Sequence, residues 1–239
     1  MKSTCRLIVG VDAVGLLRVS RLTREPDPVH FALQAELAGA WGIRARLRID
    51  RRHLDENDMD LMNRMVKTQF YLQVSPHQDL VHLVNGLRPQ NLVLSAERRD
   101  ETASQMSLDA ALLAKELQGI IRNIDTRSTR VFLFLDPSLE QIKVAAKIQV
   151  HGVVINVRDY TLNLRDPQRE KKLTLIKDAV RFSSKFGLET HLAHGVRAEH
   201  LQDLCALPGV HAIHIGHQLV ARSLLFGVHQ TVDSYLKLM

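Results

Sequence analysis

The chain has 239 residues, of which 45% are hydrophobic and 24% charged, so it is long enough to bury a sizeable core as an ordinary globular protein. Its two cysteines give no basis for a disulfide framework and favour a reduced, cytoplasmic setting, and no segment approaches the roughly 18 apolar residues of a membrane helix. The formal net charge is +6, yet the basic residues are scattered and no nucleic-acid-binding motif accompanies them, so we expect small phosphorylated molecules as partners.

Apolar, β-branched runs alternate with amphipathic stretches along the whole chain. The first run precedes a helix that Asp27 caps and Pro28 begins, and a later helix ends before Gly187, a residue type common at helix C-termini. The predicted strands cover residues 6–14, 41–48, 69–75, 91–97, 130–136, 152–158, 188–194 and 211–217. The predicted helices cover residues 27–40, 55–67, 75–87, 107–124, 137–148, 169–187, 197–209 and 219–239.

These strand–helix units predict an α/β fold, a single (β/α)8 TIM barrel that spans residues 1–239 as one domain. A doubly wound open sheet is the alternative, but no glycine-rich dinucleotide fingerprint follows the first predicted strand. No low-complexity tract or obvious linker divides the chain. In a barrel of this type the active site lies at the carboxyl ends of the strands, which is where we look for functional residues.

Polar residues and glycines at the predicted strand ends are the candidates for a site. They are Asp12, Arg18, Arg21, Arg46, Arg48, Gln73, Glu97, Asp136, Asn156, Arg158, His194, Gly195, Gly216 and His217. The segments AHG (193–195) and IGH (215–217) close the last two strands, where such barrels often bind phosphate through backbone N–H groups and a helix N-terminus. Glycine lets an oxyanion approach the backbone, and His217 adds a donor.

Structural explanations of the same residues stay open. A histidine at a strand end is more often structural than functional, and RLRIDRRH (46–53) is explained equally well as a solvated charge run beside an acidic helix. Cys5 and Cys205 have no partner at metal-ligand spacing, so no metal site is expected. Neither a nucleophile-elbow serine nor a P-loop occurs.

Eight segments are specific in combination: LLRVSR (16–21), PDPVHFALQAELAGAWGI (26–43), LRIDRRHL (47–54), AERRDETAS (96–104), SLDA (107–110), EQIKVAA (140–146), AHGVRAEHL (193–201) and IGHQLVARSLLFGV (215–228). With them the chain resembles the pyridoxine 5′-phosphate synthase family nearly end to end. The resemblance implies a (β/α)8 barrel that condenses 1-deoxy-D-xylulose 5-phosphate with 3-amino-2-oxopropyl phosphate to give pyridoxine 5′-phosphate, inorganic phosphate and water. It also implies no metal or organic cofactor, and a homo-oligomer, an octamer, that involves neither nucleic acid nor membrane.

Carried over residue by residue, the resemblance implies that the binding half of the site is kept. Family positions that contact substrate or bind its phosphate are occupied by Asp12, Arg21, Arg48, His53, Gly195, Gly216 and His217. His194 falls on the histidine that the family uses as a proton donor.

The resemblance implies that the proton-transfer half is altered. Arg46 stands where the family has a catalytic histidine and Gln73 where it has a catalytic glutamate, so the catalytic positions of this chain are His194, Gln73 and Arg46. The further departures are Gly10 for an asparagine, Ala13 for a histidine, Ala103 (with Thr102 and Ser104 beside it) for a substrate-binding threonine, and Val154 (with Asn156 nearby) for an acidic residue.

Ring closure needs positioned proton carriers, but glutamine only forms hydrogen bonds and arginine does not deprotonate. Loss of one such carrier typically costs about 10²–10⁴-fold in rate, so we expect a synthase homologue that binds phosphorylated ligands with weak or altered activity. Three alternatives remain: an authentic synthase that uses other groups, such as Glu97 or His53; a non-catalytic paralogue that binds a phosphorylated ligand or partners a true synthase; and an enzyme for another phosphorylated substrate, with His194 as general acid.

Overall fold

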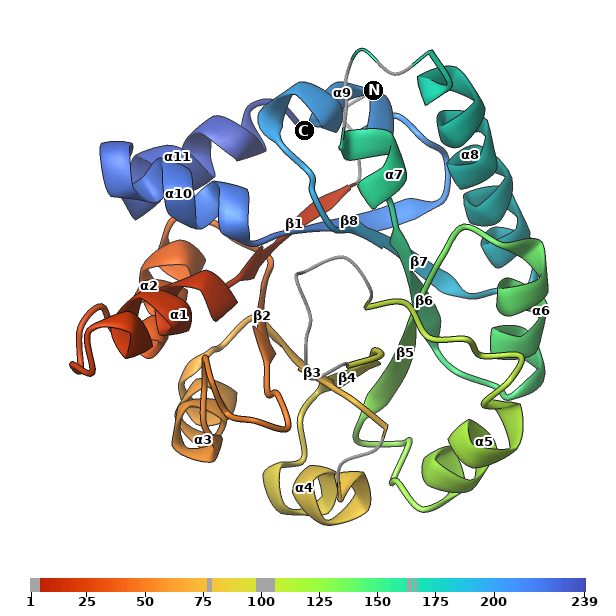
Figure 1. Ribbon diagram of the computed structural model, residues 1–239, viewed down its shortest axis with the longest axis horizontal. Coiled ribbons are helices and arrows are strands. Elements are labelled where there is room, and N and C mark those ends of the chain that lie inside the picture. Colours follow the sequence, from red (N-terminus) through yellow and green to blue (C-terminus); the bar gives the residue numbers. More distant parts are fainter. Residues whose placement is uncertain (1–4, 77–78, 98–105, 163–164, 166) are drawn as a thin grey trace.

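The strands close into a parallel barrel in chain order, from β1 to β8, in the computed structural model, which describes residues 5–76, 79–97, 106–162, 165 and 167–239 (Figure 1). The strands are β1 (Arg6–Gly10), β2 (Gly42–Arg46), β3 (Gln69–Val74), β4 (Asn91–Leu94), β5 (Arg130–Leu135), β6 (Gly152–Asn156), β7 (Glu189–Ala193) and β8 (Val210–Ile215). Parallel pairing of β8 with β1 completes the ring. The predicted single (β/α)8 TIM barrel is therefore confirmed.

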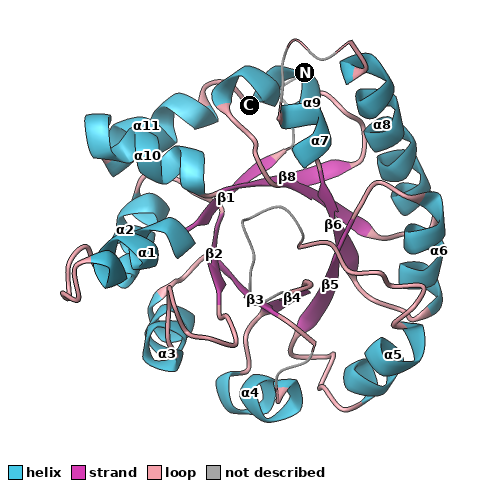
Figure 2. Cartoon of the chain, in the orientation of Figure 1, coloured by secondary structure: helices cyan, strands magenta, loops and turns pink. Residues whose placement is uncertain are grey.

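Helices cover the outside of this barrel (Figure 2). They are α1 (Asp12–Ser20), α2 (Pro28–Leu37), α3 (Glu56–Met65), α4 (Leu80–Leu87), α5 (Ala114–Arg122), α6 (Leu139–Lys147), α7 (Arg158–Thr161), α8 (Arg169–Lys185), the short 3-10 helix η1 (Ala198–His200), α9 (Leu201–Cys205), α10 (His217–Phe226) and α11 (Val228–Leu236). The predicted start of α2 is confirmed, because Oδ1 of Asp27 accepts a hydrogen bond from the backbone N–H of Val29 at 2.8 Å. None of the helices in the described part of the chain has the length and apolar character needed to span a membrane.

The structure corrects the predicted elements at three junctions. The first strand ends at Gly10 and not at residue 14, because helix α1 begins already at Asp12. The short helix α7 follows β6 directly and was not predicted. The last predicted helix is two helices, α10 and α11, which meet at Gly227, where φ is +79°. Apolar residues lie on both sides of the first and third junctions, such as Val11 and Val14 or Phe226 and Val228, so the hydrophobic pattern does not mark the change of element there.

The buried side chains form two shells, because successive residues of a strand point to opposite faces of the sheet. Ile43 and Ala45 of β2 belong to the shell between strands and helices. Ile8, Tyr71 and Phe132 belong to the shell inside the barrel. The alternation therefore turns Arg44 and Arg46 of β2 toward the barrel interior, near the carboxyl ends of the strands.

Candidate active site

Asp12, in the first turn of α1, links the carboxyl ends of β1 and β2. Its Oδ2 accepts a hydrogen bond from Nη2 of Arg44 at 2.8 Å, and its Oδ1 accepts one from the backbone N–H of Arg46 at 2.6 Å. The first helical turn suits a carboxylate, since a helix N-terminus carries partial positive charge. The predicted substrate-contacting aspartate thus lies at the mouth of the barrel with both oxygens engaged by β2.

Arg44 is a buried arginine of this mouth that the sequence analysis missed. Only 9% of the residue is exposed. Its Nη2 lies 2.5 Å from where a Cβ on Gly10 would be and 3.3 Å from where a Cβ on Gly216 would be, so the guanidinium fills space that two glycines leave open. A signal for it was present in the sequence: Arg44 lies two residues before Arg46 in a strand and therefore shares its face.

Arg46 and Arg48 converge on one buried carboxylate at the end of β4. Nη2 of Arg46 donates to the carbonyl oxygen of Ala96 at 3.0 Å and lies 3.9 Å from Oε2 of Glu97. Nη2 of Arg48 lies 3.5 Å from Oε1 of Glu97, and the same guanidinium pairs with Asp50 at 3.0 Å. Glu97 therefore holds two arginines together in the part of the site where the resemblance implies a catalytic histidine in the family.

Gln73 is fully buried near the end of β3. Its Nε2 donates to Oγ of Ser95 at 3.0 Å and lies 3.8 Å from Sδ of Met106. Its Oε1 is buried and has no hydrogen-bond partner among the residues that the structure describes. The side chain predicted at a catalytic position is thus a neutral amide buried in the interior of the barrel.

His194, directly after β7, is oriented by Asn156 at the end of β6. Nδ1 of His194 lies 3.1 Å from Oδ1 of Asn156, and Nδ2 of Asn156 donates to Oδ1 of Asp136 at 3.0 Å. Because the carboxylate of Asp136 only accepts, the amide oxygen of Asn156 must face the histidine. Neutral His194 therefore carries its proton on Nδ1, and Nε2 is the acceptor.

The three predicted phosphate-binding residues follow two neighbouring strands, β7 and β8. Gly195 has φ of +76°, and a Cβ there would lie 2.3 Å from Oγ1 of Thr161, so the position requires glycine. Gly216 is the N-cap of α10 and His217 its first residue, which is exposed. The backbone N–H groups of this helix start are the donors on which the prediction depends.

Of the other two predicted substrate-binding residues, Arg21 lies apart from this cluster and His53 lies beside α1, close enough to feel the charge of Asp12. Arg21 is exposed and follows the last residue of α1, and a rise of about 1.5 Å per residue places it roughly 13 Å along the helix from Asp12. His53 is half-buried, and its carbonyl oxygen accepts a hydrogen bond from Arg18 at 3.5 Å. Burial lowers the pKa of His53, while the charge of Asp12 acts in the opposite direction.

The remaining candidates are accounted for as follows. Arg18 pairs with Asp58 through contacts of 2.8 and 2.6 Å, which tie α1 to α3. Val154 packs inside the barrel among apolar side chains. Residues 102, 103 and 104 lie outside the described residues. Within the described part of the chain no group of three or more histidine, cysteine, aspartate or glutamate side chains is arranged to hold a metal ion.

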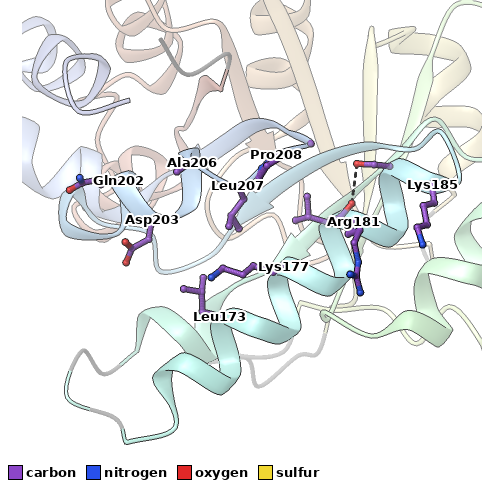
Figure 3. A pocket seen from close by; sticks show the side chains of 12 residues that line it. Leu173, Lys177, Arg181, Lys185, Gln202, Asp203, Ala206, Leu207 and Pro208 are labelled. Atoms are coloured by element: carbon purple, nitrogen blue, oxygen red, sulfur yellow. Dashed lines mark hydrogen bonds between the residues drawn. The ribbon is translucent and has the colours of Figure 1, made fainter. Parts of the chain in front are cut away.

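A groove of about 1120 Å³ lies elsewhere, on the outer surface between α8 and the segment from α9 to β8 (Figure 3). Buried apolar residues such as Leu173 and Leu207 line it together with Lys177 and Arg181, whose side chains extend from one face of α8 (Figure 3). None of its lining residues is a predicted site residue. Its size alone therefore does not make it the candidate active site, because the polar groups with defined geometry are at the strand ends.

The fold and the strand-end cluster define a class: a (β/α)8 barrel with glycines and a helix N-terminus at the carboxyl ends of its last two strands. The family model for "Pyridoxal phosphate biosynthesis protein PdxJ" matches residues 7–239. The chain belongs to this family.

Curated relatives are similar over almost their whole length. A protein of Syntrophotalea carbinolica named pyridoxine 5′-phosphate synthase is 35% identical over 224 residues, which cover 94% of both chains. One of Pelobacter propionicus with the same name is 33% identical over 233 residues, which cover 98% of both chains. Among solved structures, the tryptophan synthase A-subunit of Pyrococcus furiosus matches with a TM-score of 0.65 at 13% identity, covering 99% of each chain, and shows the fold alone.

Proposed function

We propose that the chain is a pyridoxine 5′-phosphate synthase homologue of vitamin B6 biosynthesis that binds the family's phosphorylated substrates, with weak or altered turnover. Family membership over residues 7–239 and the names of its relatives support the first part. The observation that carries the second part is the state of the two replaced positions. Gln73 is buried and bonded to Ser95, and Arg46 is paired with Glu97, so neither side chain serves as a proton carrier.

Binding falls to the residues of the kept half of the site. The phosphate group lies at the N-terminus of α10, where Gly216 and His217 offer backbone N–H groups, beside Gly195. Asp12, Arg48 and His53 are the proposed substrate contacts near the mouth. Arg21 is kept as a substrate contact through the family resemblance alone.

Chemistry falls mainly to His194. The condensation of 1-deoxy-D-xylulose 5-phosphate with 3-amino-2-oxopropyl phosphate requires several proton transfers. His194 donates a proton when its ring is doubly protonated, and Asn156 keeps the ring in one orientation through the 3.1 Å contact with Nδ1. No second proton carrier stands at position 46 or 73, so steps that need an acid or base besides His194 are slow.

A second candidate is a non-catalytic paralogue that binds a phosphorylated ligand or partners a true synthase. The ion pairs of Arg46 and Arg48 favour it, because Arg46 already pairs with Glu97, and Arg48 with Glu97 and Asp50, without any substrate. Buried ion pairs of this kind are compatible with a purely structural role. Recovery of a true synthase with this chain in a pull-down supports this candidate.

The test of the main proposal is synthase turnover. Purified protein is mixed with 1-deoxy-D-xylulose 5-phosphate and freshly generated 3-amino-2-oxopropyl phosphate, and pyridoxine 5′-phosphate is followed by its fluorescence. We expect binding of the phosphorylated substrates with little or no product. Turnover at an ordinary enzymatic rate, on the order of 0.1–10 per second or more, contradicts the assignment of Gln73 and Arg46 as disabling.

The proposal extends to the state of the protein in the cell. It includes a cytoplasmic location, function without a metal or organic cofactor, and assembly into a homo-oligomer, an octamer as the family resemblance implies. Exposed leucines on α10 support assembly, since Leu224 is 68% and Leu225 is 78% exposed.

A further inference from the structure

We propose that Arg44 is an additional anion-binding residue at the mouth of this barrel, where its guanidinium binds the phosphate group of the substrate together with the N-terminus of α10. The inference rests on the proposed function for a phosphate at Gly216. It goes beyond that function because Arg44 is not among the positions carried over from the family resemblance.

The first argument is where Arg44 lies. Its Nη2 is 3.3 Å from where a Cβ on Gly216 would be, at the point where β8 gives way to α10. Gly216 contributes no side-chain cap, and the first N–H groups of a helix have no acceptor within the helix. An oxyanion there meets backbone donors on one side and a guanidinium on the other.

The second argument is that Arg44 has donors in reserve. To the described residues the Arg44 side chain donates a single hydrogen bond, from Nη2 to Oδ2 of Asp12 at 2.8 Å. Its Nε is buried and has no partner in the part of the chain that the structure describes. Keeping cationic donors buried without acceptors costs free energy, so the arrangement favours a ligand that brings several acceptor oxygens.

The third argument is charge. Asp12 is the one carboxylate in ion-pair contact with Arg44 among the described residues, and its other oxygen accepts the backbone N–H of Arg46. His214 is 2% exposed, and its pKa is lowered by burial first and then by the charges of His191 and Arg44, so it is neutral and neither adds to nor offsets the charge of Arg44. A phosphate dianion therefore meets a cation that a single carboxylate compensates.

The lack of a side chain at Gly10 leaves the space that the Arg44 guanidinium occupies. A Cβ on Gly10 would lie 2.5 Å from Nη2 of Arg44, closer than such atoms approach, and 3.1 Å from Cα of Gly216. Gly10→Ala therefore displaces the guanidinium and also presses on the backbone of Gly216. Gly10 replaces a family asparagine, so the departure at this position and the placement of Arg44 belong together.

The experiment is calorimetric titration of the full chain with inorganic phosphate. We expect Arg44→Gln to raise the Kd about 10- to 100-fold, as for loss of hydrogen bonds to a charged group. Gly10→Ala should raise it by less, because the charge stays but moves. Lys177→Gln, on the outer groove, is the matched control for loss of one positive charge and should leave the Kd unchanged. Circular dichroism confirms that each variant is folded, and Arg44→Lys replaces Arg44→Gln if the latter does not fold.

His217→Gln separates this inference from the proposed function. If Arg44→Gln and His217→Gln both weaken phosphate binding while Lys177→Gln does not, Arg44 belongs to the phosphate site. If His217→Gln alone weakens it, the role of Arg44 is overturned and the proposed phosphate site stands. If neither variant changes the Kd, the role of Arg44 is overturned, while the backbone N–H groups of α10 still account for a phosphate site. If the unmodified chain binds no phosphate, both are overturned.

Discussion

At the scale of single residues, positions 46 and 73 decide how much chemistry this barrel performs. The double variant Arg46→His/Gln73→Glu supplies a titratable group at each position. Burial of a glutamate at 73 raises its pKa toward neutrality, where a general base is most effective. We expect synthase turnover to rise by about 10²-fold or more, measured as pyridoxine 5′-phosphate fluorescence.

The matched control for this gain is the same double change in a chain that also carries His194→Gln. If His194 is the proton donor, the triple variant should lose the gained turnover while it keeps phosphate binding. A double variant that matches the unmodified chain in both turnover and binding shows that these two positions do not matter.

Glycines at positive φ give a second prediction at this scale. Gly187 and Gly195 have φ of +70° and +76°, but a Cβ meets nothing within 4 Å at Gly187 and meets Oγ1 of Thr161 at 2.3 Å at Gly195. Gly187→Ala should therefore lower the free energy of unfolding by about 1–2 kcal/mol from backbone strain alone. Gly195→Ala should cost about 1–3 kcal/mol more, because Thr161 must move as well.

Urea denaturation of both variants checks this difference. Equal losses of free energy would show that Thr161 moves aside without cost, and Gly195 would then be required only for its backbone conformation. Thr161→Ala combined with Gly195→Ala should recover part of the loss, because Oγ1 is the atom in the way.

At the scale of elements, the sequence predicted every strand and most helices, because alternating apolar runs mark buried parallel strands well. It failed at two places where a strand passes into a helix across a single residue. Val11 alone separates β1 from α1, so the apolar run from residue 6 to 14 was assigned to one strand. The physical boundary is the closure of the first helical turn around Asp12, which hydrophobicity does not report.

Strands β5, β7 and β8 carry a polar chain through the barrel interior. Nη2 of Arg130 lies 2.6 Å from Oε2 of Glu189, and Oε1 of Glu189 lies 2.8 Å from Nε2 of His191. Nδ1 of His191 lies 3.0 Å from Nε2 of His214. Burial opposes ionisation of Glu189, but hydrogen bonds from His191 and Arg130 outweigh it and lower its pKa to about 2. An ionised Glu189 accepts only, so both histidines are neutral donors along one direction.

This series of hydrogen-bonded side chains makes the stability of the protein depend on pH. The pKa values of His191 and His214 are lowered, first by burial, from the ordinary 6.5. The unfolded chain therefore binds more protons than the folded chain below about pH 6.5, and the free energy of unfolding should fall as the pH drops through that range. Above it both states hold neutral histidines and the stability is fully present. Chemical denaturation at several pH values measures the slope.

The variant His191→Asn/His214→Asn tests which groups cause the slope. It should be less stable at neutral pH, because buried hydrogen bonds are lost, but its stability should depend less on pH between about 6.5 and 5. His229→Asn on α11, an exposed position, is the control and should keep the slope of the unmodified chain. An unchanged slope in the double variant would assign the pH dependence to other groups.

At the scale of the whole molecule, the sequence could place the site but not complete it. The barrel rule brought Asp12, His194 and Gly216 to one end, and the family resemblance named their positions. The family resemblance could not identify Arg44, since a resemblance carries over only the positions that a family uses. What places Arg44 is the register of β1 with β2 and β8, which brings Gly10 and Gly216 beside it. Register is a property of the closed sheet.

On the outer surface of the barrel, exposed apolar side chains are concentrated in one region. Helices α1 and α10 pack side by side (Figure 1). Large apolar side chains are exposed along them and just beyond α1. These are Leu16 at 49%, Leu22 at 92%, Leu224 at 68%, Leu225 at 78% and Phe226 at 49% exposure. Apolar side chains gathered on neighbouring elements are typical of surfaces that a partner covers, which is why we place subunit contacts of the proposed homo-oligomer here.

Leu225→Glu tests this placement. Burial of one leucine at an interface contributes about 1.5–3 kcal/mol, and a buried unpaired carboxylate adds a further cost, so the variant should dissociate to smaller species. Its far-ultraviolet circular dichroism should not change, because the side chain is exposed in the monomer. Leu112→Glu is the matched control, since Leu112 is 80% exposed but lies before α5. The molar mass measured by light scattering should fall for Leu225→Glu and remain unchanged for Leu112→Glu. A monomeric unmodified chain contradicts the assembly itself, whereas an intact oligomer in the Leu225 variant moves the contacts to another face.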